Sequence, residues 1–383
     1  MTSMLFYSLS FLSVIIAFGA IYITMVAAFP TQWTYYHYHF RKPINWLLFT
    51  GLLIWTISIF LQTDTFPFWT IIPLIICALG LFLTYKIHQE VFFKAVNFPK
   101  MTTNLTTLPI KEDMELAVIE YDGKTKCYPL DYLIHHHILN DSFNTKLVSL
   151  TYCAMCRSII PFDVTETGPL FVGSFKGGNM IVADVKTKTF FQQSTFQSIR
   201  GKLHPSELQM IPFQILTWKE VKTALQNPEV AIVTSDDLKK FELPVPGIWD
   251  KLINSEKTPG VSNKDKSFPS RTRVIGVRST PPGEEVVYLK SEVLAQKTVR
   301  NEQHNFILIR VENTVVGFTT NLSLVYERQR LIDNSSKTEW TINGTHIKGP
   351  VNENLSLLSM SDEYWFSWKK FHPKSILIRL GGK

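Results

Sequence analysis

The chain has 383 residues, of which 45% are hydrophobic and 19% charged, and these proportions exclude a disordered protein and a lone small module. Its net charge of +7 does not indicate a nucleic-acid partner, because residues 101–383 carry 34 basic against 30 acidic side chains and no basic run longer than two. Four cysteines are too few for a disulfide-rich secreted scaffold. Cys77 lies in an apolar stretch, which leaves Cys127, Cys153 and Cys156 for chemistry.

The first quarter of the chain is typical of a membrane protein. Three segments contain no Asp, Glu, Lys, Arg or His and are long enough to cross or nearly cross a bilayer core of roughly 30 Å. They are Leu5–Phe29, Ile44–Leu61 and Phe66–Tyr85. We predict a three-helix transmembrane region over residues 1–100, with the lipid bilayer as its partner.

The short connections of this region carry an asymmetric charge. Arg41 and Lys42 lie in the predicted loop after the first span, where Pro43 marks the start of the second, and Lys86, Lys94 and Lys100 follow the third span. The opposite side has Asp64 and no Lys or Arg. By the positive-inside rule we expect a multi-pass protein of the bacterial inner membrane whose large C-terminal region faces the cytoplasm.

From about Met114 onward, short alternating runs separated by turn residues predict strands, whereas helical patterns are few. The fold class expected is therefore a helical transmembrane region followed by an α+β, mainly β, soluble domain. The predicted strands are Leu116–Glu120, Lys146–Tyr152, Ser158–Phe162, Leu170–Phe175 and Met180–Val185, and the predicted helices are Asp131–Leu139 and Trp218–Leu225.

The soluble region also contains an internal sequence repeat. Asp184–Phe191 aligns without gaps on Asp333–Trp340, each followed by a glycine, and Trp218-Lys219 aligns on Trp368-Lys369. The offset of about 150 residues is far longer than a solenoid repeat, so it predicts two tandem similar lobes packed together. We place the first lobe at residues 101–250, a linker at 251–272, and a second lobe without cysteines at 273–383.

The chemistry of the first lobe centres on Cys153 and Cys156. An alternating strand precedes them and Arg157-Ser-Ile-Ile-Pro161 predicts another, so a hairpin turn carries the pair. In a redox pair of this spacing, the first cysteine normally lies at a helix N-terminus, which favours its thiolate form. No helix is predicted here, but the positive charge of Arg157 could partly replace that effect. Thiol exchange, a thiolate metal site, and two packed thiols or a stable disulfide all remain open.

A metal site needs further ligands, because two thiolates are half of the tetrahedral set that zinc prefers. Cys127 and one histidine, from His135–His137 or His204, would have to complete a zinc site, and the thioether of Met155 would favour copper(I) instead. The competing interpretation is a non-enzymatic sensor or scaffold domain attached to a membrane partner. We interpret Asp184 and Asp333 as devices that hydrogen-bond the backbone of a turn.

Several elements together resemble the bacterial and archaeal domain-of-unknown-function family 3179. They are Tyr128-Pro129, Thr151-Tyr-Cys-Ala-Met-Cys156, Asn179–Asp184, Thr187 with Gln193, and the Trp-rich ending Trp365–Pro373. The resemblance covers about Met114 to Ile378 and implies family membership without an activity. We expect the shared residues Tyr152, Asn179, Asp184, Thr187 and Gln193, together with His204, to support the thiol site.

The chain departs from the family pattern at three positions. Members usually have Ala before the Tyr-Pro, Pro after the first Cys, and Arg after the aspartate, where this sequence has Cys127, Ala154 and Val185. Loss of that arginine weakens any site that depends on its charge. Similar members often carry export signals, and this implies an extracytoplasmic domain as the alternative location.

Overall fold

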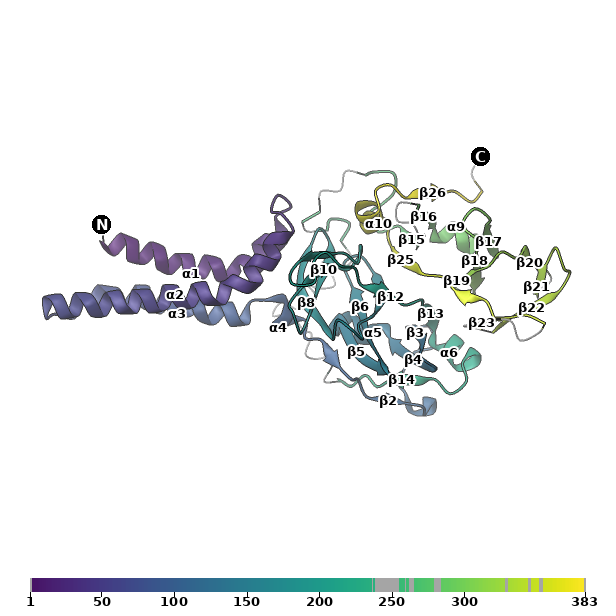
Figure 1. Ribbon diagram of the computed structural model, residues 1–383, viewed down its shortest axis with the longest axis horizontal. Coiled ribbons are helices and arrows are strands. Elements are labelled where there is room, and N and C mark those ends of the chain that lie inside the picture. Colours follow the sequence, from purple (N-terminus) through teal and green to yellow (C-terminus); the bar gives the residue numbers. More distant parts are fainter. Residues whose placement is uncertain are drawn as a thin grey trace.

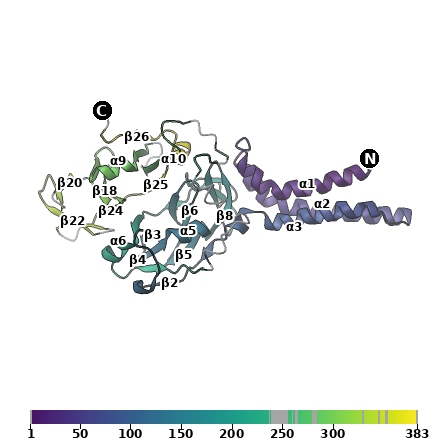
Figure 2. The same ribbon diagram turned by 180° about the vertical axis from the view of Figure 1, so that it is seen from behind.

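The computed structural model describes residues 2–235, 237, 255–258, 260–261, 265–278, 284–327, 330–343, 346–350 and 354–381. Three long helices project from one side of a body built mainly of β-sheets, and Figures 1 and 2 show this arrangement from opposite sides. Of the predicted linker at residues 251–272, residues 251–254, 259 and 262–264 lie outside the described residues.

The helical region confirms the prediction of three apolar helices that are long enough to cross a membrane. It consists of α1 (Thr2–Met25), α2 (Gln32–Thr63), the short 3-10 helix η1 (Phe68–Thr70) and α3 (Ile71–Lys86). The predicted loop before Pro43 is wrong, because α2 already begins at Gln32 and Pro43 lies inside it. The first turns of α2 are held in the helix by packing, since the rings of Tyr35 and Tyr38 lie 5.5 and 5.3 Å from the ring of Phe190 in the body.

The body also holds the end of α1. The ammonium of Lys176 donates to the carbonyls of Ile23 (2.7 Å) and Val26 (2.6 Å), which are among the carbonyls left unpaired at a helix C-terminus. The helix α4 (Gln89–Phe92) follows α3, and Gln89 donates to the Ala20 carbonyl at 2.7 Å. The connection between α1 and α2 therefore lies on the same side of the helical region as the body.

Three sheets form the first half of the body. Two five-stranded sheets face each other and the third lies beside the helical region (Figure 1). In sheet order, the first is β13 (Gln214–Thr217), β3 (Glu115–Tyr121), β4 (Lys124–Pro129), β14 (Glu229–Ala231) and β2 (Met101–Thr102). The second is β1 (Val96–Asn97), β5 (Ile138–Phe143), β6 (Lys146–Cys153), β7 (Ser158–Asp163) and β12 (Gln209–Met210). The third is β11 (Ser198–Arg200), β10 (Phe190–Gln192), β9 (Asn179–Asp184) and β8 (Leu170–Lys176).

The second half of the body has three four-stranded sheets. In sheet order, the first is β25 (Met360–Tyr364), β15 (Arg273–Val277), β16 (Val286–Leu289) and β26 (Ile376–Ile378). The second is β17 (Thr298–Asn301), β18 (Phe306–Val311), β19 (Thr314–Thr319) and β24 (Ser356–Leu357). The third is β20 (Leu324–Glu327), β21 (Arg330–Asp333), β22 (Glu339–Asn343) and β23 (His346–Lys348). The mainly β class predicted for the soluble region is confirmed.

Short helices follow or connect the strands. They are α5 (Leu130–His136), α6 (Trp218–Ala224), α9 (Lys290–Ala295), α10 (Trp365–Phe371) and the 3-10 helix η2 (Leu105–Thr107). The five predicted strands are present as β3, β6, β7, β8 and β9, and α6 is confirmed. The predicted helix Asp131–Leu139 is wrong at its end, because α5 stops at His136, His137 takes a positive φ of 62°, and Ile138 starts β5. Ile138 and Leu139 are strand residues because they pair with β6 in the sheet.

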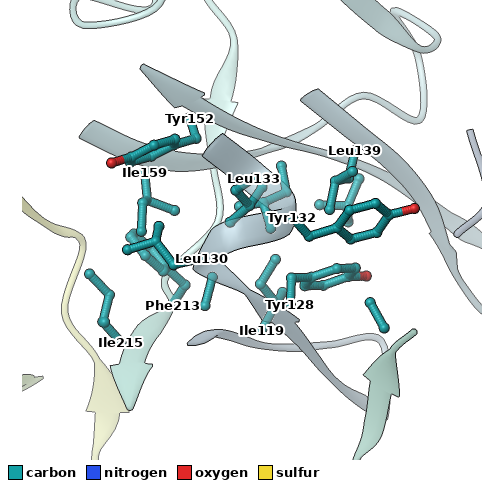
Figure 3. Packing of buried hydrophobic residues seen from close by; sticks show 14 of the residues in the cluster. Ile119, Tyr128, Leu130, Tyr132, Leu133, Leu139, Tyr152, Ile159, Phe213 and Ile215 are labelled. Carbon is teal, nitrogen blue, oxygen red and sulfur yellow. The ribbon is translucent and has the colours of Figure 1, made fainter. Parts of the chain in front are cut away.

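The hydrophobic core is continuous between the two halves. One cluster fills the space between the first two sheets and includes Tyr128, Tyr152 and Phe213 (Figure 3). Another joins Val118 and Trp218 of the first half to Phe318 of the second, all of them buried. Burial of this shared apolar surface from water holds the two halves against each other.

Candidate functional site

The two neighbouring cysteines lie at a hairpin, as the sequence predicts. Strand β6 ends at Cys153 and β7 begins at Ser158, and these two residues face each other in the antiparallel ladder. The loop between them is Ala154–Arg157, in which Arg157 closes the turn with a positive φ of 59°. Both cysteines are fully buried, and both are free thiols.

A buried polar network surrounds the sulfur of Cys156. The amide nitrogen of Asn179 donates to this sulfur at 3.2 Å, and the Ser158 hydroxyl lies 3.1 Å from it. The amide oxygen of Gln193 accepts from both Ser158 (2.8 Å) and Asn179 (2.9 Å), while the amide nitrogen of Gln193 donates to Thr151 at 2.9 Å. Strands β6, β7 and β9 and the residue after β10 thus meet at one thiol.

This network can hold Cys156 in either protonation state. When the Ser158 hydroxyl donates to Gln193, its oxygen is free to accept the proton of the Cys156 thiol. When the Ser158 hydroxyl turns toward the sulfur, it and the Asn179 amide supply two donors to a thiolate. Rotation of one hydroxyl is the only change required between the two states.

The two thiols have opposite electrostatic environments. Burial alone would raise the pKa of Cys156, but hydrogen bonds from Cys153, Ser158 and Asn179 outweigh it and hold that pKa below its ordinary value. Burial raises the pKa of Cys153 well above its ordinary value, and its thiol donates to the Gly178 carbonyl at 3.8 Å. Cys156 is therefore the sulfur that more readily becomes a thiolate.

The second half of the body covers the hairpin loop. The backbone N–H of Tyr364 donates to the Cys156 carbonyl at 3.0 Å, and the ring of Phe366 packs in the same apolar cluster as both cysteines. Arg271 donates to the carbonyl of Met155. Glu363 is fully buried close to Cys156, and burial raises the pKa of its carboxyl group. The thiols thus lie at the junction of the two halves.

Arg157 belongs to an ion cluster at this junction and does not support a thiolate, contrary to our expectation. Its guanidinium pairs with Glu115 of β3, and Glu115 also lies 3.6 Å from Arg273. Arg273 and Lys290 in turn bind the carboxylate of Asp362 at 2.5 and 2.7 Å. Because these side chains come from β3, the hairpin loop, β15, α9 and β25, the cluster links the thiol loop to the second half.

Of the predicted supporting residues, only Asn179 and Gln193 join Cys156. Side chains alternate across a strand, so Tyr152 points to the opposite face from Cys153 and packs beside Ile159 in the cluster between the first two sheets (Figure 3). His204 is exposed, and its ring nitrogen contacts Ser198 at 3.0 Å.

Cys127 has to be removed from the predicted site. It lies in β4, where it pairs with Val118 in the ladder and packs with Trp218 in the cluster shared with the second half. Cys153 and Cys156 belong to a different cluster. The alternation of β4 explains this, since its next residue, Tyr128, packs in the cluster between the sheets and Cys127 faces the other way.

Asp184 and Thr187 form a turn of their own, apart from the thiols. The carboxylate of Asp184 accepts from the Thr187 hydroxyl at 2.6 Å and from the Thr189 backbone at 2.8 Å. Asp333 accepts in the same way from the Ser336 hydroxyl at 2.6 Å and its backbone at 2.9 Å. The interpretation of both aspartates as turn devices is confirmed.

The residues around the thiols do not fit a zinc centre. Among the described residues, no three His, Cys, Asp or Glu side chains gather closely enough to hold an ion. Besides Cys153, the side chains that contact the Cys156 sulfur are a hydroxyl and an amide, which zinc rarely takes as ligands, and Cys127 and His204 lie elsewhere. Copper(I) binding with Met155 stays a prediction.

Sequence reasoning missed Ser158 and Glu363 as neighbours of Cys156. The strand pairing is the signal that could have found Ser158. In a hairpin whose first strand ends at Cys153 and whose second begins at Ser158, these two residues lie opposite each other. Glu363 has no comparable local signal, since it lies more than two hundred residues further along the chain.

Comparison with known proteins gives one match. The family described as "Protein of unknown function (DUF3179)" matches residues 93–375, which include every element of the thiol site. Neither a curated protein nor a solved structure matches the chain. The chain therefore belongs to the DUF3179 family.

Proposed function

We propose that this protein is a membrane-anchored thiol-redox protein in which Cys156 reacts first and Cys153 then closes a disulfide with it. The observation that carries the proposal is the pair of donors, Ser158 and Asn179, within 3.2 Å of the Cys156 sulfur. Hydrogen bonds to a charged group contribute about 1.5–3 kcal/mol each, so two of them favour the thiolate substantially.

The buried site suits a small oxidant, and we assign a peroxide. The Cys156 thiolate attacks one peroxide oxygen, the O–O bond breaks, and the departing hydroxide takes up a proton to become water, leaving a sulfenic acid. The sulfur of Cys153 then attacks the sulfur of Cys156. An S–S bond forms, the S–O bond breaks, and the Cys153 proton leaves with the hydroxide as a second water.

The test is oxidation of the reduced, purified full-length protein by hydrogen peroxide in detergent. We expect a disulfide between Cys153 and Cys156, found by mass spectrometry after alkylation of the unfolded chain, while Cys77 and Cys127 are alkylated. Cys153→Ser should stop at a sulfenic acid on Cys156 that dimedone traps. Asn179→Ala should slow the first step ~10-fold, because one donor to the thiolate is lost.

Cys127→Ser is the matched control, because Cys127 is equally buried but has no such donors, and it should oxidise as wild type. Oxidation of Cys156 no faster than that of Cys127 would contradict the proposal and favour the scaffold alternative. Stoichiometric copper or zinc that is lost in Cys153→Ser would favour a metal site instead.

We infer in addition that the body consists of two tandem lobes of one duplicated unit. Each sheet of the first half has a counterpart in the second half with the same strand order. The order β13-β3-β4-β14 corresponds to β25-β15-β16-β26, and β5-β6-β7-β12 corresponds to β17-β18-β19-β24. The order β11-β10-β9-β8 corresponds to β23-β22-β21-β20. Helices α6 and α10 each begin at a Trp, so the structure aligns Trp218 with Trp365. The sequence comparison instead aligns Trp218 with Trp368, three residues further along α10. An experimental strand order that broke this correspondence would contradict the inference.

The two lobes differ where the chemistry lies. In the second lobe, Val311 pairs with Thr314 across a loop of only two residues, whereas the thiol loop has four. The extra residues include Cys156 itself. The thiol site is thus an addition to one copy of the proposed unit.

For the orientation we propose that the body lies in the cytoplasm. Three spans place the body and the α1–α2 connection on one side, together with Arg41, Lys42 and Lys86. In a bacterial host, a fluorescent protein fused after Lys383 should therefore be bright and alkaline phosphatase fused there inactive. Active phosphatase would establish the extracytoplasmic alternative.

A further inference from the structure

A pocket of about 400 Å³ opens at the junction of the two lobes. Phe196, Glu207 and Leu208 line it from the first lobe, and Arg278, Glu285 and His372 from the second. Its volume is in the range of small-molecule sites, and its lining combines apolar rings with charged groups. Phe196 and Leu208 also pack in the apolar cluster that contains both cysteines, so the pocket lies beside the thiol site.

The guanidinium of Arg278 is the pocket's cation, and the negative charges of Glu363, Glu285 and Glu207 act on it from a distance. Among the described residues, no carboxylate lies within 4.0 Å of it, and its Nε is buried without a hydrogen-bond partner. It stacks on Phe196, with 3.8 Å from its carbon to the ring centre, and burial lowers its pKa to about 10. Buried charges in proteins are ordinarily in direct contact with a counterion, so a guanidinium at a pocket wall that contacts no carboxylate is a site for the carboxylate of a ligand.

The neighbours of Arg278 fix its position without neutralising it. Its Nη2 donates to the Ser194 carbonyl and lies 3.2 Å from His372 Nε2. His372 is uncharged at neutral pH, because burial and the nearby Arg278 lower its pKa to about 3. Nδ1 of the His372 ring lies 3.6 Å from Glu285. The guanidinium is therefore preorganised for direct contact with the carboxylate of a ligand.

The mouth of the pocket carries the opposite charge. Glu207 is exposed there, and its carboxylate has no cation within 4.0 Å among the described residues. A simple anion would be repelled by Glu207, whereas a molecule with a carboxylate at one end and an ammonium at the other matches both charges. We propose that this inter-lobe pocket binds a small zwitterion of the amino-acid class, with its carboxylate on Arg278 and its ammonium toward Glu207.

The test is calorimetric titration of the full-length protein in detergent with each common amino acid in turn. We expect saturable binding of at least one. Its N-acetyl derivative, which keeps only the carboxylate, should bind more weakly, and its methyl ester, which keeps only the ammonium, should not bind. Arg278→Gln should weaken binding of the amino acid ~10-fold or more, since a charge-assisted hydrogen bond is lost.

Glu207→Gln is the second variant, because this exposed side chain can be replaced without disturbing the core. It should weaken binding of the amino acid, and it should strengthen binding of the N-acetyl derivative, because the repulsion between two carboxylates is removed. Arg330→Gln, at an exposed arginine elsewhere in the second lobe, is the matched control and should bind as wild type. Cys156→Ser should also bind as wild type, so the result is independent of the proposed redox chemistry.

Three results would overturn the inference. They are the absence of saturable binding by every amino acid, equal affinity in a folded Arg278→Gln protein, and an N-acetyl derivative that binds as tightly as its parent in both wild type and Glu207→Gln.

Discussion

Replacement of Asp362 by asparagine should lower the free energy of unfolding by about 3 kcal/mol, near the low end reported for breaking buried ion pairs. Asp362 is 7% exposed and binds both Arg273 and Lys290, so its loss leaves the buried Lys290 ammonium without a counterion. We choose the low end because Arg273 is partly exposed to solvent. Urea unfolding of the full-length protein in detergent, followed by tryptophan fluorescence, measures the difference.

The same pair of proteins gives a pH test. Burial alone would raise the pKa of Asp362, but the cations of Lys290, Arg273 and Arg157 lower it well below its ordinary value. A carboxyl group with a lowered folded-state pKa stabilises the fold above its unfolded pKa of about 3.9, and that stability is lost as the pH falls further. The difference between wild type and Asp362→Asn should be full at pH 7 and shrink below about pH 4.

Arg330→Gln is the control, because Arg330 and Glu339 form an exposed ion pair with a distance of 3.0 Å. Loss of such a surface pair should lower the free energy of unfolding by only about 0–1 kcal/mol. Equal effects of Asp362→Asn and Arg330→Gln would show that the ion cluster does not hold the two halves of the body together.

Replacement of Trp368 by alanine should lower the free energy of unfolding by about 3–5 kcal/mol, the range for replacing a buried tryptophan with alanine. Trp368 is fully buried in α10, and its indole nitrogen donates to Ser375 at 2.9 Å. Its ring also lies 4.2 Å from that of His372, so the change should remove support from the inter-lobe pocket. The denaturation midpoint in urea measures the loss.

A double-mutant cycle with Gly276 provides the control for Trp368. A Cβ added at Gly276 would lie 2.1 Å from the Trp368 ring, so Gly276→Ala alone should be destabilising. In the Trp368→Ala background the ring is gone and the same methyl group should cost little. Additive effects of the two changes would contradict this packing.

Local patterns predicted the helical region and part of the first half of the body. Apolar runs without charge gave the three helices, and alternation gave β3 and β6–β9 within one or two residues. The failures occurred where distant contacts decide. The start of α2 is helical because its tyrosines pack on Phe190 of the body, and Ile138 is a strand residue because β6 pairs with it.

The site could be predicted only in part. The spacing of Cys153 and Cys156 and the strands around them indicated a hairpin, and the family resemblance added Asn179 and Gln193. Arg157 was misjudged, because its neighbour in sequence is a cysteine but its partner in space is Glu115. The pocket on Arg278 depends on the packing of one half of the body on the other, which no local pattern encodes.

The tip of the β8–β9 hairpin contacts two regions that the sequence keeps far apart. Within four consecutive residues, Lys176 holds the last carbonyls of α1, the Gly178 carbonyl accepts from the Cys153 thiol, and Asn179 donates to Cys156. A disulfide would take away the proton that Gly178 accepts and the sulfur charge that Asn179 solvates. One short hairpin tip therefore joins the thiol pair to the end of an apolar helix through direct hydrogen bonds.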